Sequence, residues 1–246
     1  CALPISTLHW APAWSLVAML MAAIAIAVLV APLTERGLLR FFYGHDEVLL
    51  VLVTYAMFLC MEDITKIIWG ANPYYVSEPY GLFGNIEIGD QVYVGYDFLL
   101  VFLAVVVGSI VWWALNKTRQ GKIVTAVIHS PEIASSMGVR VSQVYMYAFG
   151  IGVFLAAIGG AFTAPMISVQ PGLSVSVIIL SFAVVIIGGL GSIEGAAIGA
   201  LIVGLSRATA VHLVPVAELF SIYVVMAMVL MVRPEGLFQR IQARKI

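Results

Sequence analysis

The chain has 246 residues, of which 62% are apolar and only 10% are charged, and its mean hydropathy is +1.07. Soluble domains contain about 45–50% apolar and about 25% charged residues, so this composition excludes a water-soluble globular protein and predicts a protein embedded in membrane lipid. The formal net charge of −1, from 12 basic and 13 acidic side chains, excludes a nucleic-acid-binding protein that relies on a basic surface. Two cysteines, Cys1 and Cys60, provide no disulfide framework.

Uncharged stretches of the sequence mark the segments that can cross a membrane. A membrane helix needs about 20 mostly apolar residues to span a hydrocarbon core about 30 Å thick. The uncharged stretches that meet or approach this length are residues 10–34, 48–61, 98–116, 141–193 and 195–206, and a further candidate, 216–232, carries Glu218 near one end. The stretch 141–193 is long enough for two crossings, with a turn at Pro171-Gly172 and a kink at Pro165. The sequence therefore predicts an all-α polytopic membrane protein with about seven crossings, in one transmembrane domain over residues 1–246.

One crossing is short, and the start of the chain is unusual. The stretch 195–206 is too short to cross alone, so its helix must either carry Arg207 into the interface or be discontinuous. The chain has neither an initiator methionine nor a signal peptide, so we expect an N-terminally truncated protein with at least one more crossing before residue 1. Residues 1–6 match the translated end of a common sequencing adapter, and an artefact is one interpretation of them.

The basic residues predict the orientation of the chain. Ten of the twelve lie in three segments, 34–47, 116–140 and the tail from residue 233. The segment 71–97 holds four acidic residues and no basic one. Because lysine and arginine are enriched in cytoplasmic segments, 71–97 is predicted to be an extracytoplasmic loop and the C-terminus to be cytoplasmic. The four crossings predicted between 116–140 and the tail agree with this orientation.

Three charged side chains interrupt the crossing that begins at residue 48. Glu62 and Lys66 are spaced i,i+4, and Asp63 and Lys66 are spaced i,i+3, so the three can pair on one helix face. Ionisable residues inside a membrane are candidates for a functional site. Their position late in the crossing, near the acidic loop, favours pairing at the interface over a role in the substrate path. Both interpretations stay open.

Neither a metal site nor a nucleotide site is predicted in this chain. The four histidines are scattered along the chain and do not have the sequence spacing that is typical of metal ligands. They are His9, His45, His129 and His212. The stretch that contains Gly188, Gly189, Gly191 and Ser192 is not followed by Lys-Ser or Lys-Thr, so it is not a Walker A loop. The only Gly-Lys pair, at 121–122, is followed by isoleucine, so the chain contains no Walker A motif.

These glycines instead predict either close helix packing or an opening in a helix. Gly195 and Gly199 form a Gly-xxx-Gly pair, which lets two membrane helices approach closely. A second small-residue surface consists of Ala156, Gly159 and Gly160. Packing is the favoured interpretation for most of them. The alternative is a discontinuous helix around 188–195 that lines the substrate path.

The connection 116–140 is much longer than a turn between two crossings requires. Ser130-Pro131 is typical of a helix N-cap followed by proline at the first helical position, and Gly138 is typical of a C-cap. A short helix over 131–137 is therefore predicted. The apolar residues that give the connection an amphipathic face are Ile123, Val124, Ala126, Val127, Ile133, Ala134 and Met137. Such a helix needs a surface on which to dock.

The sequence of this connection resembles the cytoplasmic loop of ABC importer permeases. Residues 118–122 are Thr-Arg-Gln-Gly-Lys. The general pattern of that loop is Glu-Ala-Ala, three residues, Gly, and this chain keeps Glu132, Ala134 and Gly138. Ile133 stands in place of the middle alanine. Further stretches resemble the branched-chain amino-acid permease branch, and these are residues 35–36, 69–73, 187–195 and 232–238. The resemblance covers residues 34–238.

The resemblance implies a permease subunit in the inner membrane of a bacterium or archaeon, with branched-chain amino acids as cargo. It implies as partners a second homologous permease subunit, two ABC ATPase subunits and an extracytoplasmic binding protein. ATP and magnesium are expected on the ATPase subunits, and this chain is expected to be a transport subunit rather than an enzyme. The loop residues that the resemblance implies for coupling to the ATPase are Arg119, Gly121, Pro131, Glu132, Ala134 and Gly138.

The extracytoplasmic loop 71–97 is expected to be ordered. Alternation of Ile86, Ile88, Val92 and Val94 predicts a small β-hairpin. The resemblance implies that a soluble binding protein docks on this side of the membrane. The loop is therefore either part of that docking surface or a simple structured cap.

Other functions stay open at this point. A urea or short-chain amide permease is the main alternative, because closely similar subunits carry different cargo. A secondary transporter would need an intramembrane ion relay, and the sequence has only one charged cluster, near one interface. A membrane enzyme would need a convergent set of acid, base or metal residues, and none is visible.

Overall fold

The computed structural model describes residues 12–42, 47–76, 79–81, 84–88, 91–189, 191–215, 218–234 and 236–238. The predicted all-α polytopic fold is confirmed, with one small β-hairpin added to the helices. The chain divides into two compact units, Cys1–Pro171 and Gly172–Ile246, and each is described by itself. The prediction of one transmembrane domain over residues 1–246 stays a prediction.

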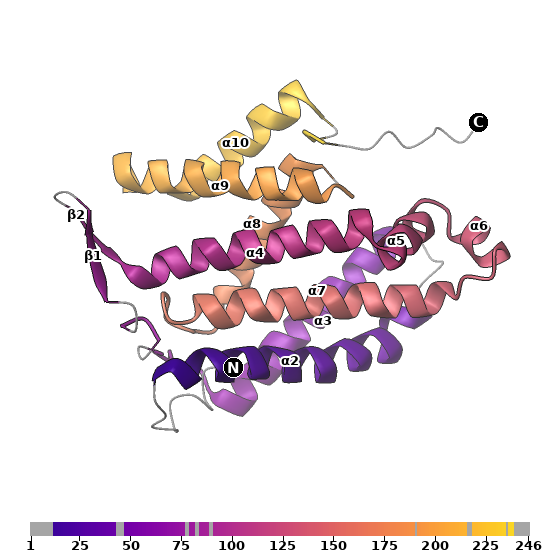
Figure 1. Ribbon diagram of the computed structural model, residues 1–246, viewed down its shortest axis with the longest axis horizontal. Helices are drawn as coiled ribbons and strands as arrows, with labels where there is room; N and C mark the ends of the chain where they lie inside the picture. The colour runs from indigo at the N-terminus through magenta and orange to yellow at the C-terminus, as the bar shows by residue number, and fades with distance from the viewer. Residues whose placement is uncertain are drawn as a thin grey trace. The chain divides into compact units, whose positions relative to one another are not determined.

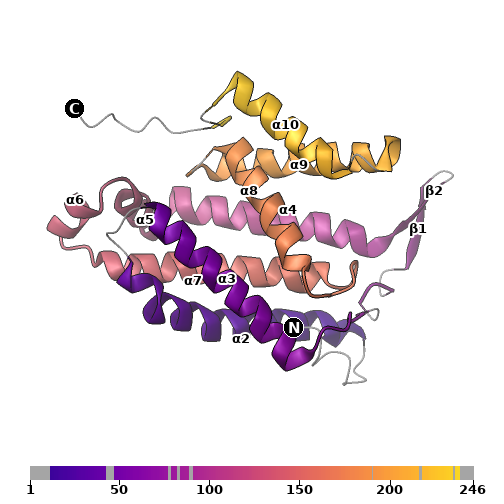
Figure 2. The same ribbon diagram turned by 180° about the vertical axis from the view of Figure 1, so that it is seen from behind.

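The first unit is organised around two long helices, α2 and α7. Its elements are α2 (Pro12–Gly37), η1 (Leu39–Phe41), α3 (Glu47–Trp69), β1 (Asn85–Ile88), β2 (Gln91–Val94), α4 (Gly95–Lys117), α5 (Arg119–His129), α6 (Pro131–Ser136) and α7 (Val141–Thr163). Helices α2 and α7 lie side by side in both views (Figures 1 and 2). Ala23, Ala27 and Ala31 recur every four residues on α2 and are all buried, so small side chains let α7 approach closely.

Larger side chains complete this contact at one end of the two helices. The buried core there contains Met19 and Ala23 of α2, Ile158, Ala161 and Phe162 of α7, and Val76. Helix α3 differs, because it runs obliquely to α2 and α7 (Figure 2) and none of its described side chains is buried. The second small-residue surface predicted on α7 is not used for packing within the described residues, since a Cβ built on Gly159 or Gly160 would meet nothing within 4 Å.

The predicted hairpin in the acidic loop is confirmed. Strands β1 and β2 are antiparallel, with Ile86 opposite Tyr93. Helix α4 begins at Gly95, directly after β2, so the C-terminal end of the predicted loop 71–97 belongs to this helix. The buried Tyr96 donates its hydroxyl to the carbonyl of Phe162 at 2.7 Å, which ties the start of α4 to the end of α7.

The second unit consists of three helices in mutual contact. They are α8 (Leu173–Gly188), α9 (Ile193–Leu213) and α10 (Glu218–Val232). Ala183, Ile187, Val203 and Ile222 form its buried core. Helix α9 is continuous through Arg207, so the alternative of a discontinuous crossing at this place is wrong. The Arg207 guanidinium is paired instead with the Glu218 carboxylate at the start of α10, with Nε 2.7 Å from Oε1.

A helix occupies each of the seven segments predicted to cross the membrane. Four are long and apolar enough to cross by length and composition, namely Trp14–Gly37, Gly95–Lys117, Val141–Thr163 and Ile193–Leu213. Two shorter apolar helices are Leu173–Gly188 and Phe220–Val232. The kink predicted at Pro165 is wrong, because α7 ends at Thr163 and the proline follows its end. The predicted turn before α8 is present, with Gly172 at a φ of +89°.

Candidate functional site

The connection between α4 and α7 lies at the end of the first unit opposite the β-hairpin (Figure 1). Its course is set by a sharp corner between α4 and α5. Thr118 separates the two helices with an extended backbone, and its hydroxyl donates to the carbonyl of Ala114. The same oxygen accepts from the Gly121 amide at 3.1 Å and so caps α5. A Cβ on Gly121 would overlap the backbone of Ala114 and Leu115, so only glycine fits this corner.

A second corner separates α5 from α6. Val127 of α5 is fully buried, and Ser130 is the residue between the two helices. The Ser130 amide donates to the Ala126 carbonyl, and its own carbonyl accepts from the Ala134 amide at 3.0 Å. Pro131 occupies the first helical position as predicted. The Ser130 side chain, however, makes no capping hydrogen bond.

The short helix predicted over 131–137 is confirmed as α6, Pro131–Ser136. Its C-terminus has the hydrogen bonds of a Schellman motif, in which the Gly138 amide donates to the Ser135 carbonyl at 2.9 Å and the Val139 amide to the Ala134 carbonyl at 3.1 Å. Gly138 has a φ of +84°, the left-handed conformation that this motif requires. Gly138 therefore defines where α6 stops.

The single amphipathic face predicted for the connection is wrong. Ala134 is 5% exposed and is the buried residue of α6, whereas Ile133 is 64% and Met137 is 81% exposed. The chain turns at Ser130, so the apolar residues of α5 and α6 do not form one continuous stripe. Ile133 and Met137 are one helical turn apart and share a face. Glu132 is exposed beside them. An exposed apolar pair therefore projects from a small, firmly terminated helix.

The glycines of the second unit form the turn between α8 and α9. Helix α8 ends at Gly188, and Gly189 and Gly191 have φ values of +95° and +83°. Ser192 is buried and caps α9 by accepting from the Gly195 amide at 3.0 Å. The predicted break in the helix is thus present as a turn between two helices. A role for these residues in a substrate path stays a prediction.

Close approach of α8 and α9 depends on two glycines of α9. A Cβ on Gly195 would overlap the backbone of Gly188, and a Cβ on Gly199 would lie 2.5 Å from the Val184 carbonyl oxygen. The packing role predicted for this Gly-xxx-Gly pair is therefore confirmed by the contact of its residues with α8.

The segment that follows α10 returns to this turn, a contact that sequence reasoning did not reveal. The Leu237 amide donates to the Ile187 carbonyl at 3.0 Å, and the Phe238 amide donates to the Gly188 carbonyl at 3.1 Å. These bonds satisfy carbonyls at the end of α8 that have no partner within the helix. Gly236, with a φ of +87°, lies against Gly189. We call residues 236–238 the strap.

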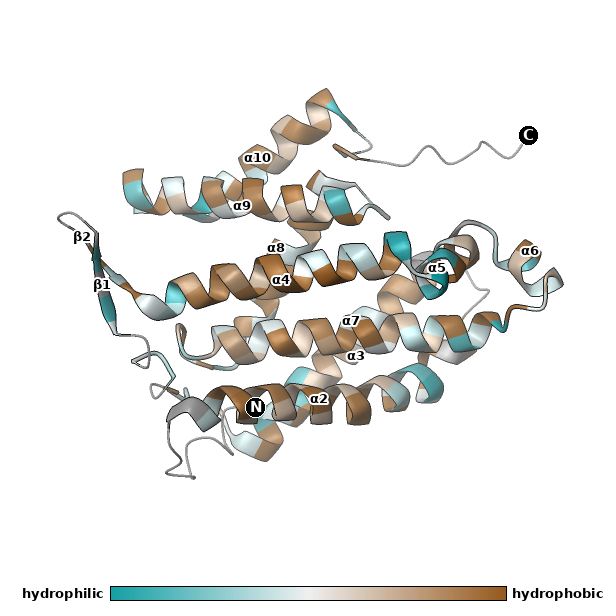
Figure 3. Ribbon diagram, in the orientation of Figure 1, coloured by the Kyte–Doolittle hydropathy of each residue, from teal (hydrophilic) through white to brown (hydrophobic). Residues whose placement is uncertain are grey.

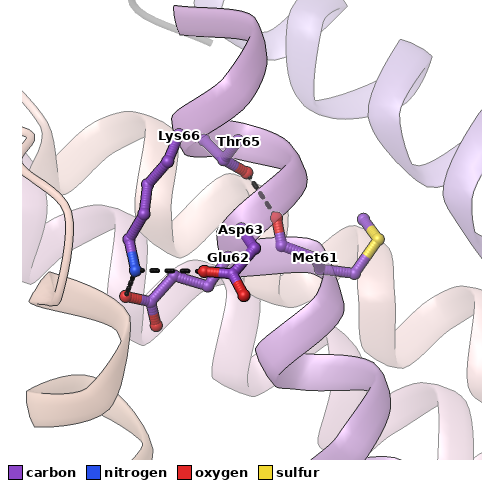
Figure 4. A network of polar contacts seen from close by, with 5 residues as sticks. All are labelled: Met61, Glu62, Asp63, Thr65 and Lys66. Atoms are coloured by element: carbon purple, nitrogen blue, oxygen red, sulfur yellow. Dashed lines mark hydrogen bonds and ion pairs between the residues drawn. The ribbon is translucent and has the colours of Figure 1, made fainter. Parts of the chain in front are cut away.

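The charged cluster predicted on α3 is assembled as expected from its spacing (Figure 4). The Lys66 ammonium nitrogen is 3.0 Å from Glu62 Oε1 and 3.3 Å from Asp63 Oδ1. The Lys66 side chain is 40% exposed and that of Asp63 is 71% exposed. Lys66 is about 4.5 Å along the helix axis from Trp69, at about 1.5 Å per residue, so the cluster lies near the end of α3. The pairing is confirmed, and a role in transport stays a prediction.

Comparison with known proteins identifies relatives over most of the chain. A family whose sequence model is described as "Branched-chain amino acid transport system / permease component" matches residues 2–232. The probable branched-chain amino acid transport permease protein LivH of Methanocaldococcus jannaschii is 29% identical over 126 residues, which cover 51% of this chain and 40% of the relative. The high-affinity branched-chain amino acid transport system permease protein LivH of Escherichia coli K12 is 27% identical over 150 residues, which cover 60% and 48%.

One relative is named for a different cargo. The fructose import permease protein FrcC of Rhizobium meliloti is 35% identical over 127 residues, which cover 49% of this chain and 34% of the relative. The match thus spans less than half the length of each of these three relatives. No solved structure matches the chain significantly.

Proposed function

Because the chain belongs to the family of permease components of branched-chain amino acid transport systems, we propose that it is a membrane-spanning subunit of an ATP-driven importer. In this proposal it pairs with a second, homologous permease subunit and forms part of the translocation path. Two ATPase subunits bind ATP and magnesium on the cytoplasmic side, and an extracytoplasmic binding protein delivers the cargo. The chain itself performs no covalent chemistry.

The observation that carries the proposal is the form of α6. Its buried Ala134 faces the protein, and its exposed Ile133 and Met137 face away from it. A membrane protein that exposes an apolar pair on a short helix outside its spans offers a contact surface to another protein. The positive charge of the segment 116–140 favours a cytoplasmic position for α6, where an ATPase subunit would meet it.

The contacts of α6 define how a movement of the partner would reach the membrane. Helix α6 contacts α5 and α7, and α5 contacts α4 and α7. Thr118 and Gly121 hold the corner between α5 and α4 closely. A displacement of α6 by a closing ATPase is therefore passed to α4 and α7, two helices that are long enough to cross the membrane. Alternating access then follows from the rocking of these helices.

The exposed pair on α6 gives the sharpest test of this mechanism. We expect Ile133→Asp combined with Met137→Asp to lower uptake at least tenfold in cells that express the complete transport system, because two charges would be forced into an apolar contact. Expression and membrane insertion should stay normal, since both side chains are exposed. Uptake of radiolabelled cargo and cargo-stimulated ATP hydrolysis in proteoliposomes measure the effect.

A matched control lies on the same helix. Ser135 is exposed and lies two positions from both Ile133 and Met137, on the opposite side of α6. Ser135→Asp adds a charge without touching the apolar pair, so uptake should change less than twofold. Normal uptake by the double aspartate variant would show that α6 does not dock on the ATPase.

Branched-chain amino acids are the proposed cargo, because the family and both LivH proteins are named for them. Import of a sugar is the second candidate, because the fructose import permease is 35% identical to this chain over the matched region. Competition experiments separate the two. Excess unlabelled isoleucine should abolish uptake of labelled leucine, whereas excess fructose should leave it unchanged. The reverse pattern, with labelled fructose accumulated, would assign the sugar.

A further inference from the structure

The corner between α4 and α5 carries three cations, of which the resemblance to ABC permeases assigns only Arg119 to coupling. Lys117 is the last residue of α4, and Arg119 and Lys122 lie in the first turn of α5. All three side chains are exposed. The chain has no acidic residue between Asp97 and Glu132. The ion pairs seen among the described residues involve Lys66 and Arg207, and none of them includes Lys117, Arg119 or Lys122.

Two exposed tryptophans precede these cations on α4. Trp112 is 41% and Trp113 is 59% exposed. Trp113 and Lys117 are spaced i,i+4, so an indole ring and an ammonium group lie one turn apart on the same face of the helix. Tryptophan prefers the level of the lipid headgroups at the ends of membrane helices. Because α4 is long and apolar enough to cross a membrane, we expect the lysine one turn beyond this ring at the level of lipid phosphates.

Helix α5 adds its charges at the same level. Arg119 and Lys122 are spaced i,i+3 and share an exposed face, whereas Val127 on the other face is fully buried. Figure 3 shows the change in hydropathy from the apolar α4 to the hydrophilic start of α5. The overlap that a Cβ on Gly121 would make with α4 shows that the first turn of α5 lies directly against the end of α4. The three cations are therefore held close to one membrane surface.

We infer that Trp113, Lys117, Arg119 and Lys122 form a binding site for the headgroup of an anionic phospholipid in the cytoplasmic leaflet. The phosphodiester would lie among the three cations, and the indole ring would lie beside the upper acyl chain. Basic residues beside a membrane helix attract anionic lipids by about 1 kcal/mol for each charge. The connection 116–140 then has two separate uses, a lipid contact at α5 and a protein contact at α6.

The inference is tested with the full chain in lipid nanodiscs. Native mass spectrometry should show that the wild-type chain retains phosphatidylglycerol in preference to phosphatidylcholine. Substitution of all three cations, Lys117→Gln, Arg119→Gln and Lys122→Gln, should weaken this retention roughly 100-fold, a factor of about five for each charge. The charge-conserving set Lys117→Arg, Arg119→Lys and Lys122→Arg should retain the lipid. Lipid retention by this variant would show that the loss in the glutamine variant does not result from misfolding.

A matched control removes the same charge from the same predicted side of the membrane. Arg36, Arg140 and Arg233 are exposed; Arg36 and Arg233 lie in the other two basic segments, and Arg140 lies at the far end of the connection, beyond α6. Their combined replacement by glutamine should change retention less than threefold. An equal loss in both triple variants would show that net charge alone attracts the lipid and would overturn the site.

Two further measurements identify the ligand. Inorganic phosphate at millimolar concentration should not displace phosphatidylglycerol, and efficient displacement would assign the cations to a free anion instead. The variant Lys117→Gln with Lys122→Gln leaves Arg119 of the coupling loop in place, so it should still copurify with the ATPase subunit. Loss of that partner with normal lipid retention would assign the two lysines to protein docking and would overturn the inference.

Discussion

Two segments, the connection at α6 in the first unit and the strap in the second, contain a glycine with nearly the same φ in very different surroundings. Gly138 ends α6 with a φ of +84°, and a Cβ built on it would meet nothing within 4 Å. Gly236 in the strap has a φ of +87°, and a Cβ built on it would lie 2.5 Å from Gly189 Cα. The first glycine is needed for its conformation alone, and the second is needed for conformation and for space.

The two segments differ in how far other parts of the chain cover them. We call the connection at α6 the open connection and the strap the closed connection. Beside Gly138 the apolar side chains of Ile133 and Met137 are exposed. Beside Gly236 the end of α8 is covered by the backbone of the strap, and Ser192 is buried. An open connection of this kind leaves apolar side chains available for contact with another molecule. A connection that holds three helices together uses glycine so that backbones can meet.

The largest effect on stability is expected at the closed connection. Gly236→Ala should lower the free energy of unfolding by about 3 kcal/mol, because a left-handed residue with a side chain costs about 1–2 kcal/mol and overpacking costs about as much again. Reversible unfolding of the full chain in mixed SDS micelles measures this change.

Gly191 provides the control for this variant within the same unit. It has a φ of +83° but has nothing within 4 Å of a Cβ built on it. Gly191→Ala should therefore lower the free energy of unfolding only by the cost of the left-handed conformation, about 1–2 kcal/mol. Equal losses for the two variants would mean that the strap does not press on Gly189.

A smaller effect is expected where α9 crosses α8. Gly199→Ala should destabilise the chain by about 2 kcal/mol, because its Cβ would lie 2.5 Å from the Val184 carbonyl oxygen and the two helices must move apart. Gly204 is on the same helix, and a Cβ built on it would meet nothing within 4 Å. Gly204→Ala should therefore stabilise the chain by about 0.5–1 kcal/mol, because alanine has the higher helix propensity. Changes of opposite sign in the free energy of unfolding, measured in the same assay, support the close contact of Gly199 with α8. A gain in stability for both variants contradicts it.

The open connection should respond locally. Gly138→Ala is expected to cost about 1–2 kcal/mol, from the left-handed conformation alone, and to loosen the end of α6 rather than the whole unit. Hydrogen exchange should become faster at the amides of residues 138 and 139, which make the Schellman bonds. Unchanged exchange at these amides, with faster exchange throughout α7, would contradict a local role.

The smallest effect separates two serines that precede helices. Ser192 makes a capping bond to the Gly195 amide, and Ser130 makes none with its side chain. Ser192→Ala should therefore cost about 1 kcal/mol, whereas Ser130→Ala should cost only a few tenths. Thermal unfolding of both variants under the same conditions compares their stabilities. A larger loss of stability for Ser130→Ala would show that Ser130, rather than Ser192, is the serine that caps its helix.

Much of the fold could be predicted from the sequence, because it depends on local patterns. The hairpin followed from alternating apolar residues at 86–94, and α6 followed from Ser130-Pro131 before it and Gly138 after it. The prediction of a kink at Pro165 was wrong, because local patterns do not locate the end of a helix inside a long apolar stretch. A proline two residues after the end of a helix and a proline inside it look alike in a long apolar stretch, and only the backbone shows that α7 ends at Thr163.

The candidate site was predicted less completely. Its residues Glu132, Ala134 and Gly138 were found from their resemblance to the loop of ABC permeases, but the exposed pair was placed on the same face as the buried Val127. A hydrophobic pattern counts apolar positions along one helix and does not register that the chain turns at Ser130. The strap was missed altogether, because a backbone hydrogen bond between residues 50 positions apart, such as Leu237 to Ile187, leaves no side-chain pattern.

By itself the sequence determined a multi-pass helical membrane protein, its predicted orientation, and the places where helices start and stop. These properties depend on composition, on the positions of a few charges and on neighbouring residues. Only the tertiary structure decided that Ile133 and Met137 face outward while Ala134 faces inward, and that the strap closes the turn between α8 and α9. Such properties depend on which surfaces meet, and that is settled by packing between distant segments rather than by any local preference.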